Sequence, residues 1–131
     1  MAIKNHVMTA HAPSTLAKIR SVASGDKLSR NQKTFGSTYR RLSFNNFSPT
    51  VTRSGYRDFI HPLKDRMLTV RELACLQSFP VTWEFKGVRL DSYSSKRKVN
   101  MTQFGQVGNA VPPVLAKVVA DILIEQVFES D

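Results

Sequence analysis

The C-terminal part of the chain constrains the fold most, because a helix start there is followed by a long apolar surface. Pro112 and Pro113 stand together, and proline in the first turn of a helix loses no hydrogen bond, since the amides there have no partner within the helix. The apolar residues that then recur at helical spacing are Leu115, Val118, Val119, Ile122, Leu123 and Val127. We expect a helix from Pro112 to Phe128 whose apolar stripe needs a covering surface, and the rest of the chain offers little regular structure for that.

A second helix start lies in the middle of the chain, where the run from Thr69 to Glu72 forms a capping box. The threonine hydroxyl accepts from the Glu72 amide, and the Glu72 carboxylate accepts from the Thr69 amide. A short helix is therefore predicted from about Val70 to Ser78, ended by Phe79-Pro80 because the residue before a proline avoids the helical conformation. Its inward residues are expected to be Leu73, Ala74 and Leu76.

The other elements have weaker signals. A helix from Thr15 to about Ala23 would be capped by Ser14. Short extended pieces are expected at Ser48–Thr52, Phe59–Pro62 and Trp83–Phe85, with a basic loop over residues 88–102. The predicted fold class is α+β: a small irregular mixed domain with short strands, one short helix and the long C-terminal helix.

Charge is distributed unevenly along the 131 residues, which are enough for one domain. The net charge is +9, of which residues 1–60 carry +8 (ten Lys or Arg against two acids) and residues 61–131 carry +1 (nine against eight). Such an excess favours a polyanionic partner, most often nucleic acid, over a merely solvated basic surface. The single cysteine excludes an internal disulfide.

Membrane insertion is not expected from the sequence. The longest apolar stretch, Val111–Ile124, is interrupted by Lys117 and Asp121 and is too short to span a bilayer. The first fourteen residues have no apolar core of signal-peptide length. A cytoplasmic protein is the default expectation.

Two segments go beyond general patterning: Arg66–Pro80, with the sequence RMLTVRELACLQSFP, and Gln106–Ala116, with the sequence QVGNAVPPVLA. In this order they closely resemble motifs nine and ten of the DNA (cytosine-5) methyltransferases. Upstream, the pieces Tyr39–Leu42, Ser48–Thr52 and Phe59–Pro62 look like the end of the target recognition region of bacterial members, and Asn5–Val7 looks like an earlier piece of it.

The resemblance implies a role for each part. Members flip a cytosine out of duplex DNA and methylate its C5 from S-adenosylmethionine, because that edge cannot be attacked within the base stack. Asn109, Ala110 and Val111 would complete the S-adenosylmethionine site, although a plain turn before a helix is the alternative. Arg40, Arg41, Thr50, Val51 and Arg53 would contact DNA, with a solvated charge or an ordinary strand residue as the alternative for any one of them.

The family's catalytic residues have no counterpart here. Its nucleophile lies in a Pro-Cys pair, a glutamate in Glu-Asn-Val assists, and a Phe-x-Gly-x-Gly turn binds the cofactor; none occurs in this chain. Cys75 follows Ala74 inside the expected helix, so it is interpreted as a small buried side chain. His6, His11 and His61 show no metal-ligand spacing. The resemblance gives Arg66, Thr69, Arg71 and Glu72 the role of organising a hinge between domains.

The hypothesis from sequence is therefore the C-terminal part of a DNA cytosine-5 methyltransferase, as in restriction–modification systems. Residues 1–62 would be the DNA-recognition region, and residues 63–131 would carry motif nine, the basic loop and the final helix. That helix would pack on the Rossmann-like catalytic domain of a separate chain or of a missing N-terminal part, without which no activity is expected. The alternatives are a stand-alone DNA-binding module, an inactive gene remnant, or a protein-interaction subunit that ignores DNA.

Overall fold

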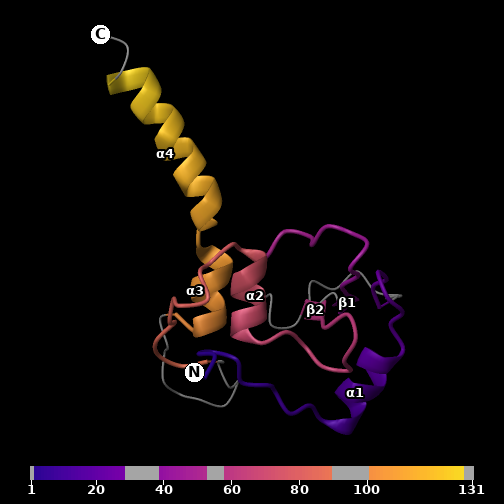
Figure 1. The fold of residues 1–131 in the computed structure, drawn as a ribbon. Helices are drawn as coiled ribbons and strands as arrows, with labels where there is room; N and C mark the ends of the chain where they lie inside the picture. The colour runs from indigo at the N-terminus through magenta and orange to yellow at the C-terminus, as the bar shows by residue number, and fades with distance from the viewer. Residues whose placement is uncertain (1, 29–38, 53–57, 90–100, 129–131) are drawn as a thin grey trace.

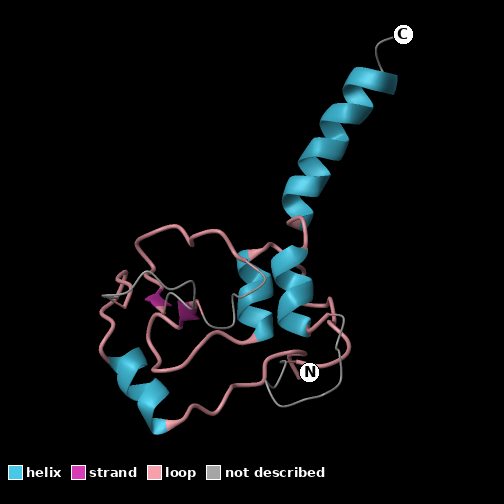
Figure 2. Ribbon diagram, turned by 180° about the vertical axis from the view of Figure 1, so that it is seen from behind, coloured by secondary structure: helices cyan, strands magenta, loops and turns pink. Residues whose placement is uncertain are grey.

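The computed structural model describes residues 2–28, 39–52, 58–89 and 101–128. These residues form four helices and two short strands: α1 (Pro13–Arg20), β1 (Arg40–Arg41), β2 (Phe59–Ile60), α2 (Val70–Leu76), α3 (Gln103–Asn109) and α4 (Pro113–Phe128). Figures 1 and 2 show α2 and α3 side by side, the strands and α1 to one side of them, and α4 extending away. The mixed architecture with a long C-terminal helix is confirmed, but it has three short helices instead of one.

The helix α2 begins as its capping box predicts. Thr69 Oγ1 accepts from the Glu72 amide at 3.2 Å, and the Glu72 carboxylate accepts from the Thr69 amide at 2.8 Å. The helix ends at Leu76, two residues earlier than predicted, because Ser78 takes a left-handed conformation with φ of 61°. Leu73 and Ala74 are buried as expected, whereas the prediction for Leu76 was wrong, since it is 41% exposed.

The helix α3 was not predicted, and it supplies much of the core. Thr102 is its N-cap and accepts from the Gly105 amide at 3.0 Å. Phe104 and Val107 are buried against α2, and Gln77 of the α2 C-cap donates to the Val107 carbonyl at 3.2 Å. A larger apolar cluster therefore forms around these two helices; its buried members are Val51, Phe59, Leu68, Val70, Leu73, Ala74, Phe85, Phe104 and Val107.

The sheet is small: β1 pairs with β2 in parallel, with Arg40 opposite Phe59 and Arg41 opposite Ile60. The extended piece at Phe59 is thereby confirmed. The strands predicted at Ser48–Thr52 and Trp83–Phe85 are wrong. At Trp83–Phe85, a side chain supplies the hydrogen bonds that a neighbouring strand would have made. The Asn5 side chain donates to the Phe85 carbonyl and accepts from the Phe85 amide.

A second, smaller apolar cluster holds α1 to the sheet. It consists of Ile19, in the last turn of α1, and Val22, just after the helix, packed on Ile60 and Met67. The start of the helix differs from the prediction, since α1 begins at Pro13 after Ala12 without a side-chain cap. Proline at the first helical position explains this, because its backbone is already set for the helix and it has no amide to cap.

The helix α4 is present as predicted; its first turn is bonded to Ser78 through the Val114 amide, but its side chains stay exposed. Every residue from Val114 to Val127 is exposed, and Figure 1 shows the helix projecting from the body. At 100° per residue, its apolar side chains occupy more than half of the circumference, and Lys117 pairs with Asp121 at 2.6 Å on the remaining side. A helix that is apolar over so wide an arc is normally buried.

By length and composition alone, the run Gln103–Val127 is long and apolar enough to cross a membrane, with mean hydropathy 1.6; it extends beyond the Val111–Ile124 stretch considered from the sequence. The run is not one helix, however, since α3 ends at Asn109 and α4 starts at Pro113. The core residues Phe104 and Val107 belong to its first part. The 16 residues of α4 alone measure about 24 Å, short of the roughly 30 Å hydrocarbon core.

The capping box leads to a stability prediction. Thr69→Ala should lower the free energy of unfolding by about 1–2 kcal/mol, because the Glu72 amide loses its acceptor and the Glu72 carboxylate loses the hydrogen bond from the buried Thr69 hydroxyl. Urea unfolding followed by far-ultraviolet circular dichroism measures this. Thr82→Ala, at an exposed threonine, is the matched control. Equal losses in both variants would contradict the role assigned to the cap.

Candidate functional site

The segment predicted to face a cofactor, Asn109–Val111, forms the joint between α3 and α4. Asn109 is the last residue of α3 and is exposed, with its amide nitrogen 3.4 Å from the sulfur of Met101. Ala110 is extended, with φ of −78° and ψ of 147°, and Val111 is 64% exposed. The joint thus presents a polar amide, a small residue and an apolar side chain together on the surface.

The predicted DNA-contact residue Arg41 is buried, with 7% of its surface exposed. All five of its guanidinium N–H groups have partners. These are the carbonyl oxygens of Val22 (2.7 Å), Ile19 (2.8 Å), His61 (3.1 Å) and Lys64 (3.2 Å), and the carboxylate of Asp65 (2.9 Å). Arg41 therefore joins the end of α1 to the segment after β2 and has no donor left for DNA in this conformation.

The other predicted DNA-contact residues are divided between surface and core. Thr50 is exposed, whereas Val51 belongs to the larger apolar cluster. Arg40 is half-buried and makes no ion pair with a described residue. Arg53 lies outside the described residues. In Figures 1 and 2 the strand that carries Arg40 and the joint at Asn109 lie on opposite sides of α2.

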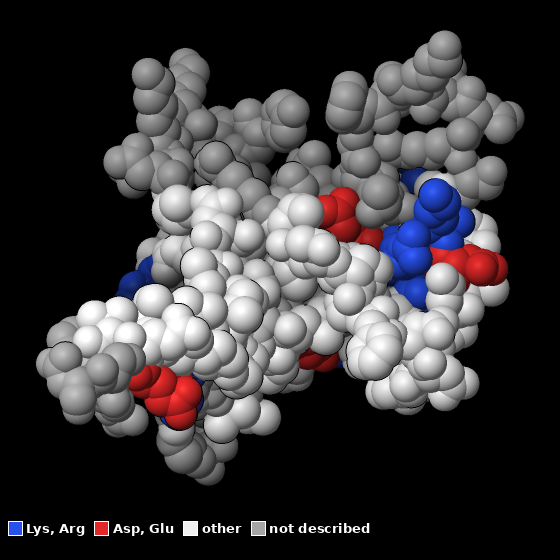
Figure 3. Space-filling model, turned by 90° about the horizontal axis from the view of Figure 1, so that it is seen from above, with Lys and Arg blue, Asp and Glu red and all other residues white. Residues whose placement is uncertain are grey.

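The basic excess of residues 1–60 is partly neutralised. Six of its cations lie in the described ranges, and three of them pair with acids: Lys4 with Glu84 at 2.7 Å, Arg20 with Asp65 at 3.4 Å, and Arg41 with Asp65. Among the described residues, no acid pairs with the other three cations, which are the exposed Lys18 and Lys27 and the half-buried Arg40. Figure 3 shows the Lys and Arg side chains visible on that face gathered mainly towards one end of the molecule.

An ion pair stabilises the start of α2. Arg66 donates to both carboxylate oxygens of Glu72, at 2.8 and 2.7 Å. Partial burial by itself raises the pKa of Glu72, but hydrogen bonds from Arg66 and Thr69 outweigh it and lower the pKa to about 2. The hydrogen bond to Glu72 also raises the pKa of Arg66. The ion pair ties the segment after β2 to the first turn of α2.

The histidines take part in structural contacts. His61 Nδ1 accepts from the amides of Leu63 and Lys64, at 3.0 and 3.1 Å. His11 Nε2 accepts from the Met67 amide at 3.1 Å. Burial lowers the pKa of both rings, and the positive charge of Arg66 lowers that of His61 further.

Asn5 is a residue whose importance the sequence did not reveal. Its side chain exchanges two hydrogen bonds with the backbone of Phe85, each 2.9 Å, and its carbonyl accepts from the Arg71 amide at 3.1 Å. Arg71 in turn donates to the carbonyls of Lys4 and Trp83. The beginning of the chain is thereby tied to α2 and to the segment after it.

Comparison with known proteins identifies the family. The model for C-5 cytosine-specific DNA methylases matches residues 2–125. This chain belongs to the C-5 cytosine-specific DNA methylase family. It is 75% identical over 127 residues to the type II methyltransferase M.AquIB of Picosynechococcus sp., covering 97% of this chain and 91% of that protein. No solved structure matches it.

Other relatives in the methylase family are much longer than this chain. It is 32% identical to the type II methyltransferase M1.HphI of Haemophilus parahaemolyticus over 94% of this chain, but this is 32% of that protein. It is 40% identical to the type II methyltransferase M.DdeI of Desulfomicrobium norvegicum over 74% of this chain and 23% of that protein. The chain therefore corresponds to a part of these larger methyltransferases.

The lowered pKa of Glu72 predicts how stability depends on pH. Its ionised form is favoured in the folded chain, so its contribution is complete above pH about 4.5 and is lost as the pH falls towards 2. Between these values, the difference in unfolding free energy between the wild type and Glu72→Gln should shrink, as urea titrations at several pH values would measure. The control, Asp121→Asn, breaks an exposed ion pair worth a few tenths of a kcal/mol. A constant difference for Glu72→Gln across this range would contradict the prediction.

Proposed function

We propose that this chain is the DNA-recognition and cofactor-pocket-completing portion of a DNA cytosine-5 methyltransferase. The catalytic portion would lie in another chain or in a missing N-terminal part. The observation that carries the proposal is α4, a helix exposed along its length and apolar over most of its surface, in a chain that spans 32% of M1.HphI and 23% of M.DdeI. Such a helix needs a partner of complementary, apolar character.

The Rossmann-like catalytic domain is our candidate for that partner. The family's nucleophile and glycine-rich cofactor turn have no match in this sequence, so the domain that bears them must be supplied separately. Each large apolar side chain that becomes fully buried contributes about 1.5–3 kcal/mol. The eight Val, Leu and Ile side chains exposed on α4 can therefore support a stable association.

The joint between α3 and α4 is the proposed contribution to the cofactor site. Its exposed Asn109 amide offers a donor and an acceptor, and Ala110 allows close approach of a ligand to the backbone. Val111 presents an apolar wall beside them. These residues fit one side of a pocket for S-adenosylmethionine, which would supply the methyl group, while the catalytic portion closes the other side.

The DNA-contact surface is proposed to include Arg40, Thr50 and Arg53, within the recognition region of residues 1–62. A hydroxyl and a backbone amide, as at Thr50, can hold a phosphate, and arginine can bind phosphate or guanine. Arg41 and Val51 shape this surface from beneath, since both are buried. A protein with this role would act in the cytoplasm, where bacterial DNA lies.

The central prediction is methyl transfer that needs both portions. The purified chain should incorporate no labelled methyl group from S-adenosylmethionine into duplex DNA, and mixing it with the chain that carries the Pro-Cys nucleophile should restore incorporation. Leu123→Asp should reduce this restored activity at least tenfold, because a charge enters the apolar side of α4. Incorporation of labelled methyl groups measures both effects.

Lys117→Ala, on the polar side of α4, is the control and should keep the restored activity within about twofold of the wild type. Activity from the isolated chain would contradict the proposal. So would a monomer that unfolds cooperatively, binds duplex DNA and ignores every catalytic chain, since that result favours a stand-alone module or a gene remnant.

Adjacent arginines should behave differently on substitution. Arg40→Gln should leave the fold intact but weaken binding of the complex to duplex DNA and, if Arg40 meets a phosphate, lower the salt slope by about 1. Arg41→Met should instead lower the free energy of unfolding by about 3–5 kcal/mol, because it leaves buried carbonyls and Asp65 without their partner. Titrations at several salt concentrations, together with urea unfolding, separate the two effects. Loss of folding in Arg40→Gln would contradict this assignment.

A further inference from the structure

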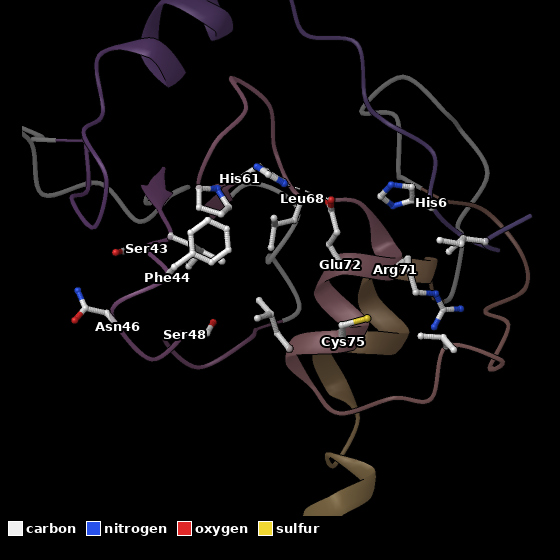
Figure 4. A pocket seen from close by; sticks show the side chains of 15 residues that line it. His6, Ser43, Phe44, Asn46, Ser48, His61, Leu68, Arg71, Glu72 and Cys75 are labelled. Atoms are coloured by element: carbon white, nitrogen blue, oxygen red, sulfur yellow. Dashed lines mark ion pairs between the residues drawn. The ribbon is translucent and has the colours of Figure 1, made fainter.

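A groove of about 390 Å3 lies between α2 and the loop after β1. Ser43, Phe44, Asn46 and Ser48 of the loop line one side, and Glu72 and Cys75 of α2 line the other, as Figure 4 shows. This volume falls within the range of ligand pockets, about 300–1,000 Å3. Cys75 is exposed in this groove, so the expectation of a buried thiol was wrong.

Four of the side chains that line the groove are large, apolar and exposed. Ile3 is 65% exposed, Phe44 76%, Leu76 41% and Val81 67%. A second hollow, which also includes Ile3 and Val81, continues the surface past the start of the chain. Large apolar side chains that gather around one concavity are typical of a protein-binding surface.

The charged residues of the groove are already engaged within the chain. Glu72 is held by Arg66 and Thr69. Arg71 donates to three backbone carbonyls, those of Lys4, Pro80 and Trp83. Apart from the two histidines, the remaining polar lining is uncharged: Ser43, Asn46 and Ser48. The groove therefore offers no free Lys or Arg donor to the phosphate backbone of DNA, and its exposed apolar side chains favour an apolar occupant.

The groove and α4 are connected. The amide of Val114, in the first turn of α4, donates to Ser78 Oγ at 3.1 Å, just beyond the end of α2. Cys75 and Leu76 of the groove lie at this same end of α2. One partner that covers α4 can therefore reach the groove as well.

We infer that the groove between α2 and the Leu42–Ser48 loop binds an apolar segment of the catalytic portion. The inference rests on the proposed function, since it names where the missing portion docks besides α4. The longer relatives M1.HphI and M.DdeI have 68% and 77% of their length outside the matched part (100 − 32 and 100 − 23), so the occupant comes from a large body of chain.

Cys75 is a built-in probe of this docking, because it is the single cysteine of the chain and is exposed in the groove. N-ethylmaleimide should label it at least tenfold more slowly in the complex with the chain carrying the Pro-Cys nucleophile than in the isolated chain; mass spectrometry of this chain separates its label from the partner's. The control is Leu63→Cys in a Cys75→Ser background, at an exposed position outside the groove, which should be labelled equally fast in both states.

A second variant pair tests the groove by affinity. Leu76→Asp should weaken the complex at least tenfold, whereas Leu63→Asp, the same change outside the groove, should stay within twofold of the wild type. Circular dichroism verifies that both variants keep their helices. Failure of all complex formation overturns the proposed function and this inference together.

The groove inference can be tested independently of the proposed function when mixing the two chains restores methyl transfer. If Cys75 is then labelled at the free rate and Leu76→Asp binds normally, only the groove inference is overturned. If duplex DNA protects Cys75 without the partner, the groove is a DNA site and the inference is likewise wrong.

Discussion

The carboxylate of Glu72 is the point on which the arrangement of the chain depends. It accepts from the Thr69 amide, the Thr69 hydroxyl and the Arg66 guanidinium, so it starts α2 and fixes the segment that leads from β2. Arg71, the residue before Glu72, fixes the N-terminal segment to the same helix, because its amide donates to the Asn5 carbonyl. Segments from three parts of the sequence thus meet at the first turn of a seven-residue helix.

The apolar side chains of the described residues are divided between a buried core and an exposed surface. Two compact clusters bury their side chains around α2 and α1, whereas α4 and the groove beside Cys75 leave apolar side chains exposed. A chain of this size can bury a core of its own, so this exposure is not a consequence of small size. The chain covers 91% of M.AquIB but only 32% of M1.HphI and 23% of M.DdeI, so the longer relatives carry this part together with much further chain.

The elements that local sequence could predict are those with local causes. The capping box and the double proline act within one helical turn, and both helices begin where these signals stand. The strands at Ser48–Thr52 and Trp83–Phe85 failed because a strand needs a neighbour, and here Asn5, 80 residues away, supplies the bonds of Phe85. The helix α3 was missed because its Thr102 cap is followed by two glycines within the helix, which weaken the helical signal.

Local sequence likewise could not predict which candidate site residues are buried and which are exposed. Arg40 and Arg41 are the same residue type side by side in the sequence, yet the pleat of β1 exposes part of one and buries the other among five acceptors. Cys75 and Leu76, expected inside, border a groove because α2 is covered on its other side by α3.

The sequence by itself determined the family, the starts of α2 and α4, the basic excess and the absence of the family's Pro-Cys pair. These follow from residue identity and short spacings. Only the tertiary structure decided which arginine is structural, where Asn5 binds and which apolar residues remain uncovered. Those outcomes depend on contacts between residues far apart in the chain, and no local pattern specifies such contacts.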